Sequence, residues 1–251
     1  MGVLSIFRKI FPGSITGTAT DEEPGTAYDL WSAEYDDQPD NLMLALDAEI
    51  FYDLFQMVPS PDQVIADIGC GTGRHWKTIL RNQPRSLTGF DASDGMLQML
   101  KKKFPAAITF KSNENILPQV QTASVDLVIS TLTIAHIENI DEALREWDRI
   151  LKKGGYLLIT DFHPAALARG AKRTFVHGKK IMSIKNFVHP LDQLIKRAAA
   201  MNLNAVELKE RFIDESVKHY YDKQNASAVY EKFKGTPIIF GLLLNKADGI
   251  S

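Results

Sequence analysis

A glycine-rich turn after a short apolar run constrains this chain more than any other stretch. The run from Val64 to Ile68 predicts a buried strand. Gly69, Gly71 and Gly73 follow it, and a helical pattern begins directly afterwards. Glycine permits backbone torsions that a Cβ forbids, and the N–H groups of such a turn can meet an anionic group. The pattern therefore predicts an α/β fold that holds a ligand at the end of this strand.

The glycine spacing separates two classes of nucleotide-binding protein. A dinucleotide-binding turn has the spacing G-x-G-x-x-G, which would put its third glycine at position 74. Arg74 occupies that position, and the third glycine is Gly73. The spacing is thus G-x-G-x-G, with Asp67 two residues before the first glycine. A nicotinamide-dependent oxidoreductase is the less favoured alternative on this ground.

Asp67-Ile-Gly-Cys-Gly-Thr-Gly73 resembles the first motif of the class I S-adenosylmethionine-dependent methyltransferases. The resemblance implies a Rossmann-like, seven-stranded, mainly parallel sheet with helices on both faces. It also implies S-adenosyl-L-methionine as cofactor and S-adenosyl-L-homocysteine as product. Because this cofactor carries a carboxylate and an ammonium, backbone N–H groups at Gly69, Cys70 and Gly71 suit the former, and Asp67, directly or through water, suits the latter.

An acid ends the next predicted strand, Ser86 to Asp91. An acid at this place lies beside the glycine turn and can accept both ribose hydroxyls, so Asp91 and the adjoining Ala92 are predicted cofactor contacts. Ser93 is a predicted N-cap of the following helix. The resemblance puts Met96 against the adenine, and plain core packing is the alternative for it.

The segment after the third predicted strand departs from the family pattern. Many relatives carry an Asp-Ala-Glu-x-Leu-Pro-like segment here, and its first two residues bond the adenine edge. This chain has Ser112 and Asn113 in those places, so a serine hydroxyl stands in for the aspartate. Glu114 completes this group of cofactor-binding candidates, with ordering of the loop as its alternative role.

The fourth predicted strand, 124–132, brings a titratable group to the ligand edge of the sheet. In open parallel sheets ligands bind beyond the carboxyl ends of the strands, so residues 130–136 are expected to border the reacting methyl. Ser130 is a cofactor-binding candidate. His136 is the candidate catalytic residue, because a histidine can take a proton from a nucleophile near pH 7. Orienting the substrate or capping the next helix are its alternatives. Asn139 to Glu142 resembles a capping box.

Three aromatic residues share one face of a helical pattern that runs from Thr26 to Met57. Tyr28, Trp31 and Tyr35 stand at helical spacing. The resemblance makes this region a lid over the cofactor, with an aromatic ring against the sulfonium in a cation–π arrangement. Tyr28 and Tyr35 are therefore cofactor-binding candidates, and ordinary lid core is the alternative. Leu42 to Phe55 predicts a helix that carries the lid.

The chain after the fifth predicted strand, 156–161, holds an expected substrate cover. Residues 165–190 form this insertion and include a predicted hairpin at Thr174 to Met182. Its histidines match no metal-site spacing, so no metal is expected. The last strand, Pro237 to Lys246, lies antiparallel beside the fifth if the resemblance holds. Tyr220, Tyr221 and Tyr230 are candidates for a substrate wall.

The composition of the chain indicates where in the cell the protein is expected and which partners it is not expected to bind. The net charge of −2 gives no reason to expect nucleic acid, and Cys70 alone forms no intrachain disulfide, which is compatible with a cytoplasmic protein. No apolar run suits stable membrane insertion. Residues 1–25 are predicted as an extension and linker, and 26–251 as a single methyltransferase domain. Two readings are open for the start of this extension. It is a helix that packs on its own domain or on the second subunit of a homodimer, or it is an amphipathic anchor that binds a surface.

These observations predict an enzyme that moves a methyl group from S-adenosylmethionine to an O, N or C atom of a small-molecule acceptor. The expected mechanism is in-line attack of the acceptor atom on the sulfonium methyl, with most of the rate from positioning in a dry pocket. A non-catalytic S-adenosylmethionine-binding protein is the main alternative, since it would share every cofactor contact.

Overall fold

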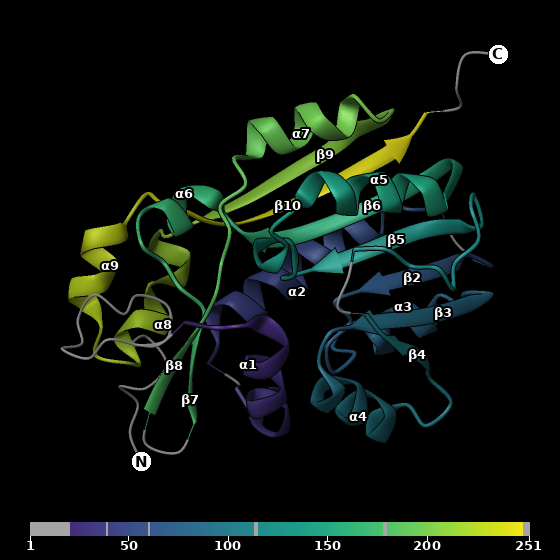
Figure 1. Ribbon diagram of the computed structural model, residues 1–251. Coiled ribbons are helices and arrows are strands. Elements are labelled where there is room, and N and C mark those ends of the chain that lie inside the picture. The colour runs from purple at the N-terminus through teal and green to yellow at the C-terminus, as the bar shows by residue number, and fades with distance from the viewer. Residues whose placement is uncertain (1–20, 39, 60, 113–114, 178–179, 248–251) are drawn as a thin grey trace.

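The structure is a computed structural model that describes residues 21–38, 40–59, 61–112, 115–177 and 180–247. Its centre is a seven-stranded sheet in the order β4-β3-β2-β5-β6-β10-β9 (Figure 1). All neighbouring strands run parallel except β10, which is antiparallel to both β6 and β9. The strands are β2 (Val64–Ile68), β3 (Ser86–Asp91), β4 (Ile108–Lys111), β5 (Val125–Thr131), β6 (Leu151–Phe162), β9 (Leu203–Phe212) and β10 (Pro237–Lys246). The predicted fold class and the antiparallel last strand are confirmed.

Helices cover both faces of the sheet because its central strands are apolar on both sides. In β5, Leu127 and Ile129 pack with α2 and α3, while Val128 packs with α5 and α7 on the opposite face. Such two-sided burial is the usual consequence of parallel pairing. The covering helices are α2 (Leu42–Phe55), α3 (Trp76–Arg81), α4 (Asp94–Lys103), α5 (Ile140–Ile150) and α7 (Leu191–Ala199).

The chain reverses its direction across the sheet between β2 and β5. From β2 it moves outward through β3 to β4, and it then returns to β5 and continues to β6 on the other side. The crevice at such a switch point, beyond the carboxyl ends of the strands, is where open α/β sheets bind ligands. The topology therefore places the glycine turn after β2 and the loop after β5 side by side.

A second small sheet packs against helix α1, and the remaining elements of the chain are short helices. The predicted hairpin is confirmed: β7 (Thr174–His177) pairs antiparallel with β8 (Lys180–Ile184), and β1 (Asp21–Glu22) joins β8. Trp31 of α1 (Pro24–Trp31) stacks on Phe175 of β7, with ring centroids 5.0 Å apart. The shorter elements are η4 (Ser32–Glu34), η5 (Ile134–His136), α6 (Pro164–Ala168), η6 (Glu215–Val217), α8 (Lys218–Asp222) and α9 (Ser227–Phe233).

Two helix boundaries differ from the sequence prediction. The helix expected directly from Gly73 begins at Trp76, because Gly73 has φ +72° and so lies outside the helical region. The lid pattern from Thr26 to Met57 divides into α1, η4 and α2, and the Asn41 side chain caps α2 by accepting from the Leu44 N–H. The predicted caps at Ser93 and Asn139 are confirmed.

The described chain holds no helix that is long and apolar enough to cross a membrane. The N-terminal amphipathic segment considered from the sequence, residues 1–20, lies outside the described residues.

Candidate functional site

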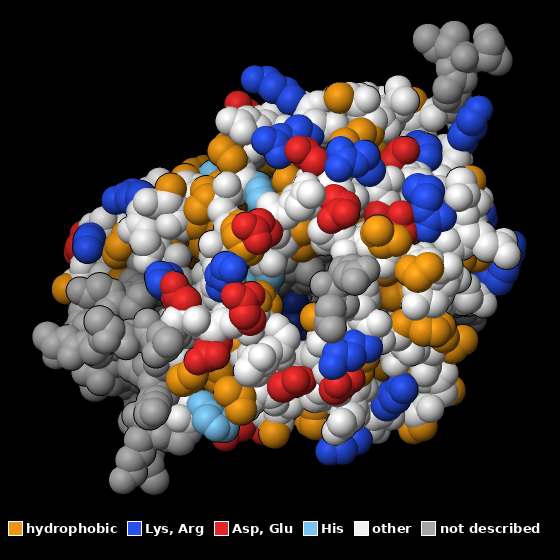
Figure 2. All heavy atoms as spheres, viewed as in Figure 1, with side chains coloured by type: hydrophobic (Ala, Val, Ile, Leu, Met, Phe, Trp, Pro, Cys, Tyr) orange, Lys and Arg blue, Asp and Glu red, His pale blue; other side chains and the backbone are white. Residues whose placement is uncertain are grey.

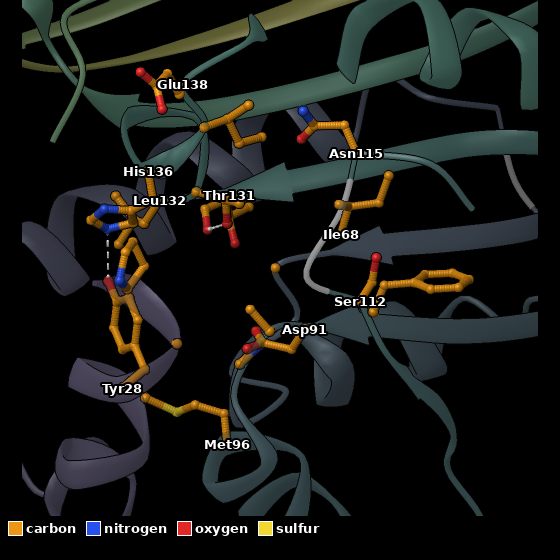
Figure 3. Close-up of a pocket in the computed structure, with 18 of the residues that line it drawn as sticks. Tyr28, Ile68, Asp91, Met96, Ser112, Asn115, Thr131, Leu132, His136 and Glu138 are labelled. Atoms are coloured by element: carbon orange, nitrogen blue, oxygen red, sulfur yellow. Dashed lines mark hydrogen bonds between the residues drawn. The ribbon is translucent and has the colours of Figure 1, made fainter. Parts of the chain in front are cut away.

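A cavity of about 470 Å³ opens at the switch point, beyond the carboxyl ends of β2, β3 and β5. Figure 2 shows the hollow near the middle of this face. We call one part of it the glycine-loop end, formed by Gly69, Gly71, Asp91, Met96 and Ser112. We call the other part the Tyr28–His136 end, formed by Tyr28, Tyr35, Leu132, His136 and Phe187. Figure 3 shows Tyr28 and His136 across the hollow from Ser112, with Asp91 and Met96 below.

The turn after β2 brings the chain backbone against this cavity. Gly69 and Gly71 have φ values of +72° and +52°. A Cβ at Gly69 would lie 2.0 Å from the Thr133 hydroxyl oxygen, whereas a Cβ at Gly71 would meet nothing within 4 Å. The first glycine thus allows the β2 and β5 loops to touch, and the second leaves room for a ligand beside the main chain.

Asp91 is the buried acid that the sequence predicted at the end of β3. Its carboxylate accepts from the Gly71 N–H at 2.8 Å and from the Ser93 N–H at 2.9 Å. Burial raises the pKa of Asp91 to about 6, although these two backbone donors oppose the change. A carboxylate with two oxygens at the cavity wall retains lone pairs for further hydroxyl donors, which fits the two hydroxyls of a ribose.

Asp67 lies behind the cavity wall, at a place that leaves only the predicted contact through water or through space open to it. Its carboxylate accepts from the indole N–H of Trp76 at 2.8 Å, and the side chain is not among the described residues that line the cavity. Burial raises its pKa to about 7, the Trp76 hydrogen bond opposes this, and the nearby Asp91 adds to it. The two acids together make the glycine-loop end favourable for a cation.

Ala92, Met96 and Ser112 lie on the cavity wall, whereas two other candidates from the same group do not. Cys70 and Ser130 are buried and are not among the described lining residues. The Ser130 hydroxyl has no hydrogen-bond partner within the described part of the chain. Asn113 and Glu114 lie outside the described residues, so their predicted roles stay predictions.

The three aromatic side chains of the lid differ in whether they line the cavity. Tyr28 and Tyr35 line the cavity, while Trp31 turns away from it into a small core with Phe175 and Ile184. The Tyr28 and Tyr35 rings lie 6.1 Å apart, nearly perpendicular to each other. Two ring faces beside the cavity provide the electron-rich surface that a cation–π contact requires.

His136 lines the cavity, as predicted, but its environment argues against a basic role. Its Nδ1 lies 2.9 Å from the Lys185 carbonyl oxygen, and its Nε2 lies 3.0 Å from Arg173 Nη1 and 3.1 Å from the Tyr28 hydroxyl. Burial lowers its pKa to about 3, and the neighbouring Arg173 cation lowers it further. A group this weakly basic is a poor proton acceptor at neutral pH, which argues against His136 as the general base.

Several residues of the site were not singled out in the sequence. Asn115, Glu138, Lys185 and Phe187 line the cavity, and the Lys185 ammonium lies 3.1 Å from the Glu23 carboxylate at the mouth. Asn115 lies in the segment after the third predicted strand, and Lys185 and Phe187 lie in the expected substrate cover, 165–190, but no motif marked these side chains individually. Glu138 follows the stretch 130–136 that was expected to border the cavity.

Other predicted lining residues are placed elsewhere. Among the described residues, Tyr221 and Tyr230 do not line the cavity but are buried in the core beneath α8 and α9, and Tyr220 packs against the same core. These three tyrosines therefore do not form a wall of this cavity, because the 217–235 connection packs them into the core. The described residues contain no cluster of His, Cys, Asp and Glu that would hold a metal.

Sequence comparison identifies a domain over the central part of the chain. Residues 66–159 match the family described as "Methyltransferase domain". The "Ubiquinone/menaquinone biosynthesis C-methyltransferase UbiE" of Campylobacter jejuni is 27% identical over 169 residues, which is 65% of this chain and 66% of that protein. "Uncharacterized methyltransferase AN0656" of Emericella nidulans is 26% identical, over 76% of this chain and 81% of its own length.

Solved structures share the fold at lower identity. An S-adenosylmethionine-dependent methyltransferase from Mesorhizobium loti superposes with a TM-score of 0.61 at 14% identity, covering 78% of this chain and 96% of that one. The [4+2]-cyclase SpnF superposes with a TM-score of 0.65 at 17% identity, covering 93% and 98%. The second protein is named as a cyclase, so this fold also supports a reaction other than methyl transfer.

Proposed function

We propose that this chain, which belongs to the class I S-adenosylmethionine-dependent methyltransferases, transfers a methyl group to an O, N or C atom of a small-molecule acceptor. One observation carries the proposal. The glycine turn and Asp91 line the same cavity, and that cavity continues past them to an aromatic end formed by Tyr28, His136 and Phe187. The cofactor fits the first part, and the second part is left for an acceptor.

The glycine-loop end suits S-adenosylmethionine by the chemistry of its groups. Asp91 would accept the ribose hydroxyls, Met96 and Ser112 would meet the adenine, and the open side of Gly71 would admit the amino-acid part. Asp67, one layer behind, would favour its ammonium through space. When bound, the cofactor supplies a methyl group on a sulfonium for attack by a nucleophile.

The Tyr28–His136 end suits an uncharged or aromatic acceptor with a few polar atoms. Its walls are the rings of Tyr28, Tyr35 and Phe187 with the side chain of Leu132, and Glu138 adds one carboxylate. Rings at this place exclude water and restrict the orientation of the acceptor. Holding a nucleophile in line with the methyl group contributes roughly 7–11 kcal/mol in favourable cases, so no strong base is needed.

The decisive experiment begins with calorimetric titration of the protein with S-adenosylhomocysteine, and with NADH as comparison. We expect binding of the former and none of the latter; the reverse result would move the chain to the oxidoreductases. Methyl transfer from labelled S-adenosylmethionine is then assayed against a panel that covers O, N and C nucleophiles. The panel includes geranyl diphosphate and the precursors of ubiquinone and menaquinone, because the names of similar proteins mention these compounds.

A protein that binds S-adenosylhomocysteine but methylates nothing in the panel would favour the non-catalytic alternative. The Asp91→Ala variant is the matched test of the site: it should lose binding while its circular dichroism spectrum stays unchanged. Asp94→Ala, three residues along and paired with Lys111 at the surface, is the control that should bind normally.

We also propose that residues 26–251 act as one domain in the cytoplasm and that the acceptor is not a nucleic acid. The net charge of −2 supports the last point, since nucleic-acid sites are basic. Size-exclusion chromatography distinguishes a monomer from a homodimer, and cell fractionation tests the location.

A further inference from the structure

We propose that Arg173 is a positioning residue: it fixes the Tyr28 hydroxyl and the His136 ring at the Tyr28–His136 end, and so joins the lid helix α1 to the loop after β5. The proposal rests on the proposed function only in that this end of the cavity receives the acceptor. Arg173 itself is not among the described lining residues, so it acts through the two side chains that it holds.

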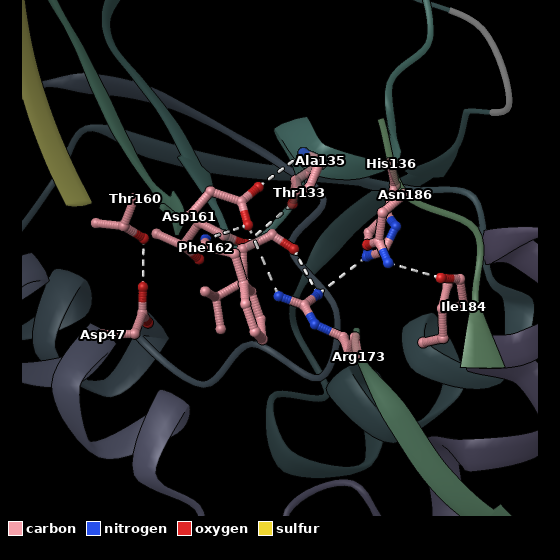
Figure 4. A network of polar contacts seen from close by, with 12 residues as sticks. Asp47, Thr133, Ala135, His136, Thr160, Asp161, Phe162, Arg173, Ile184 and Asn186 are labelled. Carbon is pink, nitrogen blue, oxygen red and sulfur yellow. Dashed lines mark hydrogen bonds and ion pairs between the residues drawn. The ribbon is translucent and has the colours of Figure 1, made fainter. Parts of the chain in front are cut away.

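Three segments that are far apart in the sequence meet at this guanidinium. Arg173 Nη1 lies 2.8 Å from the Leu132 carbonyl oxygen and 3.0 Å from His136 Nε2, and it also donates to the Tyr28 hydroxyl oxygen. Figure 4 shows the guanidinium directed toward His136 and the loop that carries Thr133 and Ala135. One side chain of the insertion thus contacts both the lid and the β5 loop.

The contacts allow one consistent assignment of the protons. A carbonyl oxygen only accepts, so His136 Nδ1 carries the proton toward Lys185 and Nε2 is the accepting nitrogen. Arg173 Nη1 has two N–H groups, which go to the Tyr28 oxygen and the Leu132 carbonyl. The Tyr28 O–H then donates to His136 Nε2, 3.1 Å away. Each polar atom of the pair has a partner, and the pair has one orientation.

Nearby groups keep the guanidinium in place without neutralising it fully. Arg173 is 7% exposed, and its Nη2 lies 3.8 Å from the Asp161 carboxylate, beyond hydrogen-bond distance. Asp161 instead accepts from the Ala135 N–H at 2.8 Å and the Phe162 N–H at 2.6 Å. The guanidinium carbon stands 4.8 Å from the centre of the Phe162 ring. Asp161 and Arg173 therefore hold the 132–136 loop from two sides.

The charge of Arg173 gives the arrangement a chemical consequence. A buried cation beside Nε2 opposes protonation of His136, because two like charges would meet in a region poor in water. Among the described residues, Asp161 lies behind Arg173, the Lys185 ammonium is directed to Glu23 at the mouth, and the Glu138 carboxylate lines the same cavity as His136. The Tyr28–His136 pair is thus neutral and serves to orient a ligand.

Nuclear magnetic resonance of the ligand-free protein tests this directly. We expect the ¹⁵N-labelled His136 ring of the wild type to stay neutral, with its proton on Nδ1, throughout titration of the folded protein. In Arg173→Met the positive neighbour is gone, so the His136 pKa should rise, although burial, the larger cause of its low pKa, remains. The ¹⁵N signal of Nε2 should also shift, because the donor that holds the Tyr28 hydroxyl is lost. Arg173→Lys keeps the charge and should leave the ring neutral. A wild-type Nε2 signal together with a wild-type titration in Arg173→Met would overturn the proposal.

Hydrogen exchange of α1 tests the link to the lid. The backbone N–H groups of α1, which begin at Gly25 because Pro24 has none, should exchange about tenfold faster in Arg173→Met than in the wild type, since an opening about 1.4 kcal/mol easier gives that factor. Arg169→Met is the matched control. It removes an arginine of the same insertion that donates to Thr236 and lies over the Phe233 ring, both of which are outside the lid, so α1 should exchange normally.

Tyr28→Phe covers the case in which Arg173→Met does not fold. It removes only the hydroxyl, leaves Arg173 beside His136 and should speed exchange of α1 severalfold while His136 stays neutral. Wild-type exchange in this variant would also overturn the proposal. None of these measurements needs a ligand, so a failure of S-adenosylhomocysteine to bind would remove the proposed function and leave the role of Arg173 to be judged separately.

Discussion

The two ends of the cavity are constructed in different ways. The glycine-loop end comes from three neighbouring strands, β2, β3 and β4, and the turns that follow them, with Met96 of α4 beside them. It presents mainly backbone and the Asp91 carboxylate to a ligand. The Tyr28–His136 end combines α1, the loop after β5 and the segment before β7, and it presents side chains. The first is a local product of one motif, and the second exists only after three distant segments have packed.

This difference has a physical reason. Under the proposed function, backbone N–H groups and a strand-end carboxylate bind the cofactor, whose chemical structure is fixed, so their geometry allows little change. Side chains on a lid and an insertion can change without altering the sheet, because such segments lie on the surface of the central core. The comparison predicts that substitutions at the two ends affect different measurements.

The largest expected effect is on the free energy of unfolding, and it comes from the buried ion pair that packs against the glycine loop. Asp47 of α2 is fully buried and accepts from Arg74, from Thr160 and, at 2.8 Å, from His75 Nε2. Although burial opposes it, Arg74 and His75 hold the pKa of Asp47 below its usual value. Removing one partner of a buried ion pair costs about 3–5 kcal/mol, so Asp47→Ala should lower the free energy of unfolding by that amount.

Urea denaturation measures this change, with Asp53→Ala on the exposed side of the same helix as the control. Since the folded pKa of Asp47 is depressed, its contribution is present above the unfolded pKa and is lost as pH falls through the folded value. A wild-type unfolding midpoint in Asp47→Ala would show that the glycine-loop end stands without this support.

The second-largest expected effect is on cofactor affinity, and it comes from substitution of Asp91. Asp91→Ala removes a charged acceptor for two hydroxyls, and each such hydrogen bond contributes about 1.5–3 kcal/mol, so affinity for S-adenosylhomocysteine should fall at least about a hundredfold. Calorimetry measures it. If Arg173→Met weakens the same affinity as strongly, the two ends are not independent and the comparison fails.

The pH dependence of cofactor binding follows from the two buried acids. The pKa of Asp67 is raised to about 7 and that of Asp91 to about 6, chiefly by burial. A bound cation and hydroxyl donors favour the ionised forms, so binding releases protons and weakens as pH falls from 8 through 6. The loss approaches about tenfold per pH unit for each carboxyl below its pKa.

Titration calorimetry in buffers of different ionisation enthalpy counts the released protons. Asp67→Asn should remove the part of the dependence near pH 7 and leave the part near pH 6. Binding that is equally tight at pH 5.5 and pH 8 would contradict the placement of both acids at the site.

The smallest expected effect separates S-adenosylmethionine from its product. A ring face beside a sulfonium contributes roughly 1 kcal/mol, and the neutral thioether of S-adenosylhomocysteine gains nothing comparable. Tyr28→Ala should therefore weaken binding of S-adenosylmethionine about fivefold relative to the product, whereas Tyr28→Phe, which keeps the ring, should preserve the ratio. Equal losses for both ligands would place Tyr28 away from the sulfonium.

The sequence by itself determined the glycine-loop end. The apolar run before Gly69, the G-x-G-x-G spacing and Asp91 at the next strand end are local patterns, and parallel strands bring their carboxyl ends to one edge. Short-range rules also fixed Ser93 and Asn139 as helix caps, because a cap is a contact between residues three apart.

Tertiary structure alone decided the other end. Nothing near Arg173 in the sequence indicates a partner, yet it meets Tyr28, Leu132 and His136 because the insertion packs against the lid. The same packing gives His136 a low pKa, since burial and a neighbouring cation depend on residues that the chain brings from elsewhere. A motif can specify backbone geometry locally, whereas the environment of a side chain is set by every segment that surrounds it.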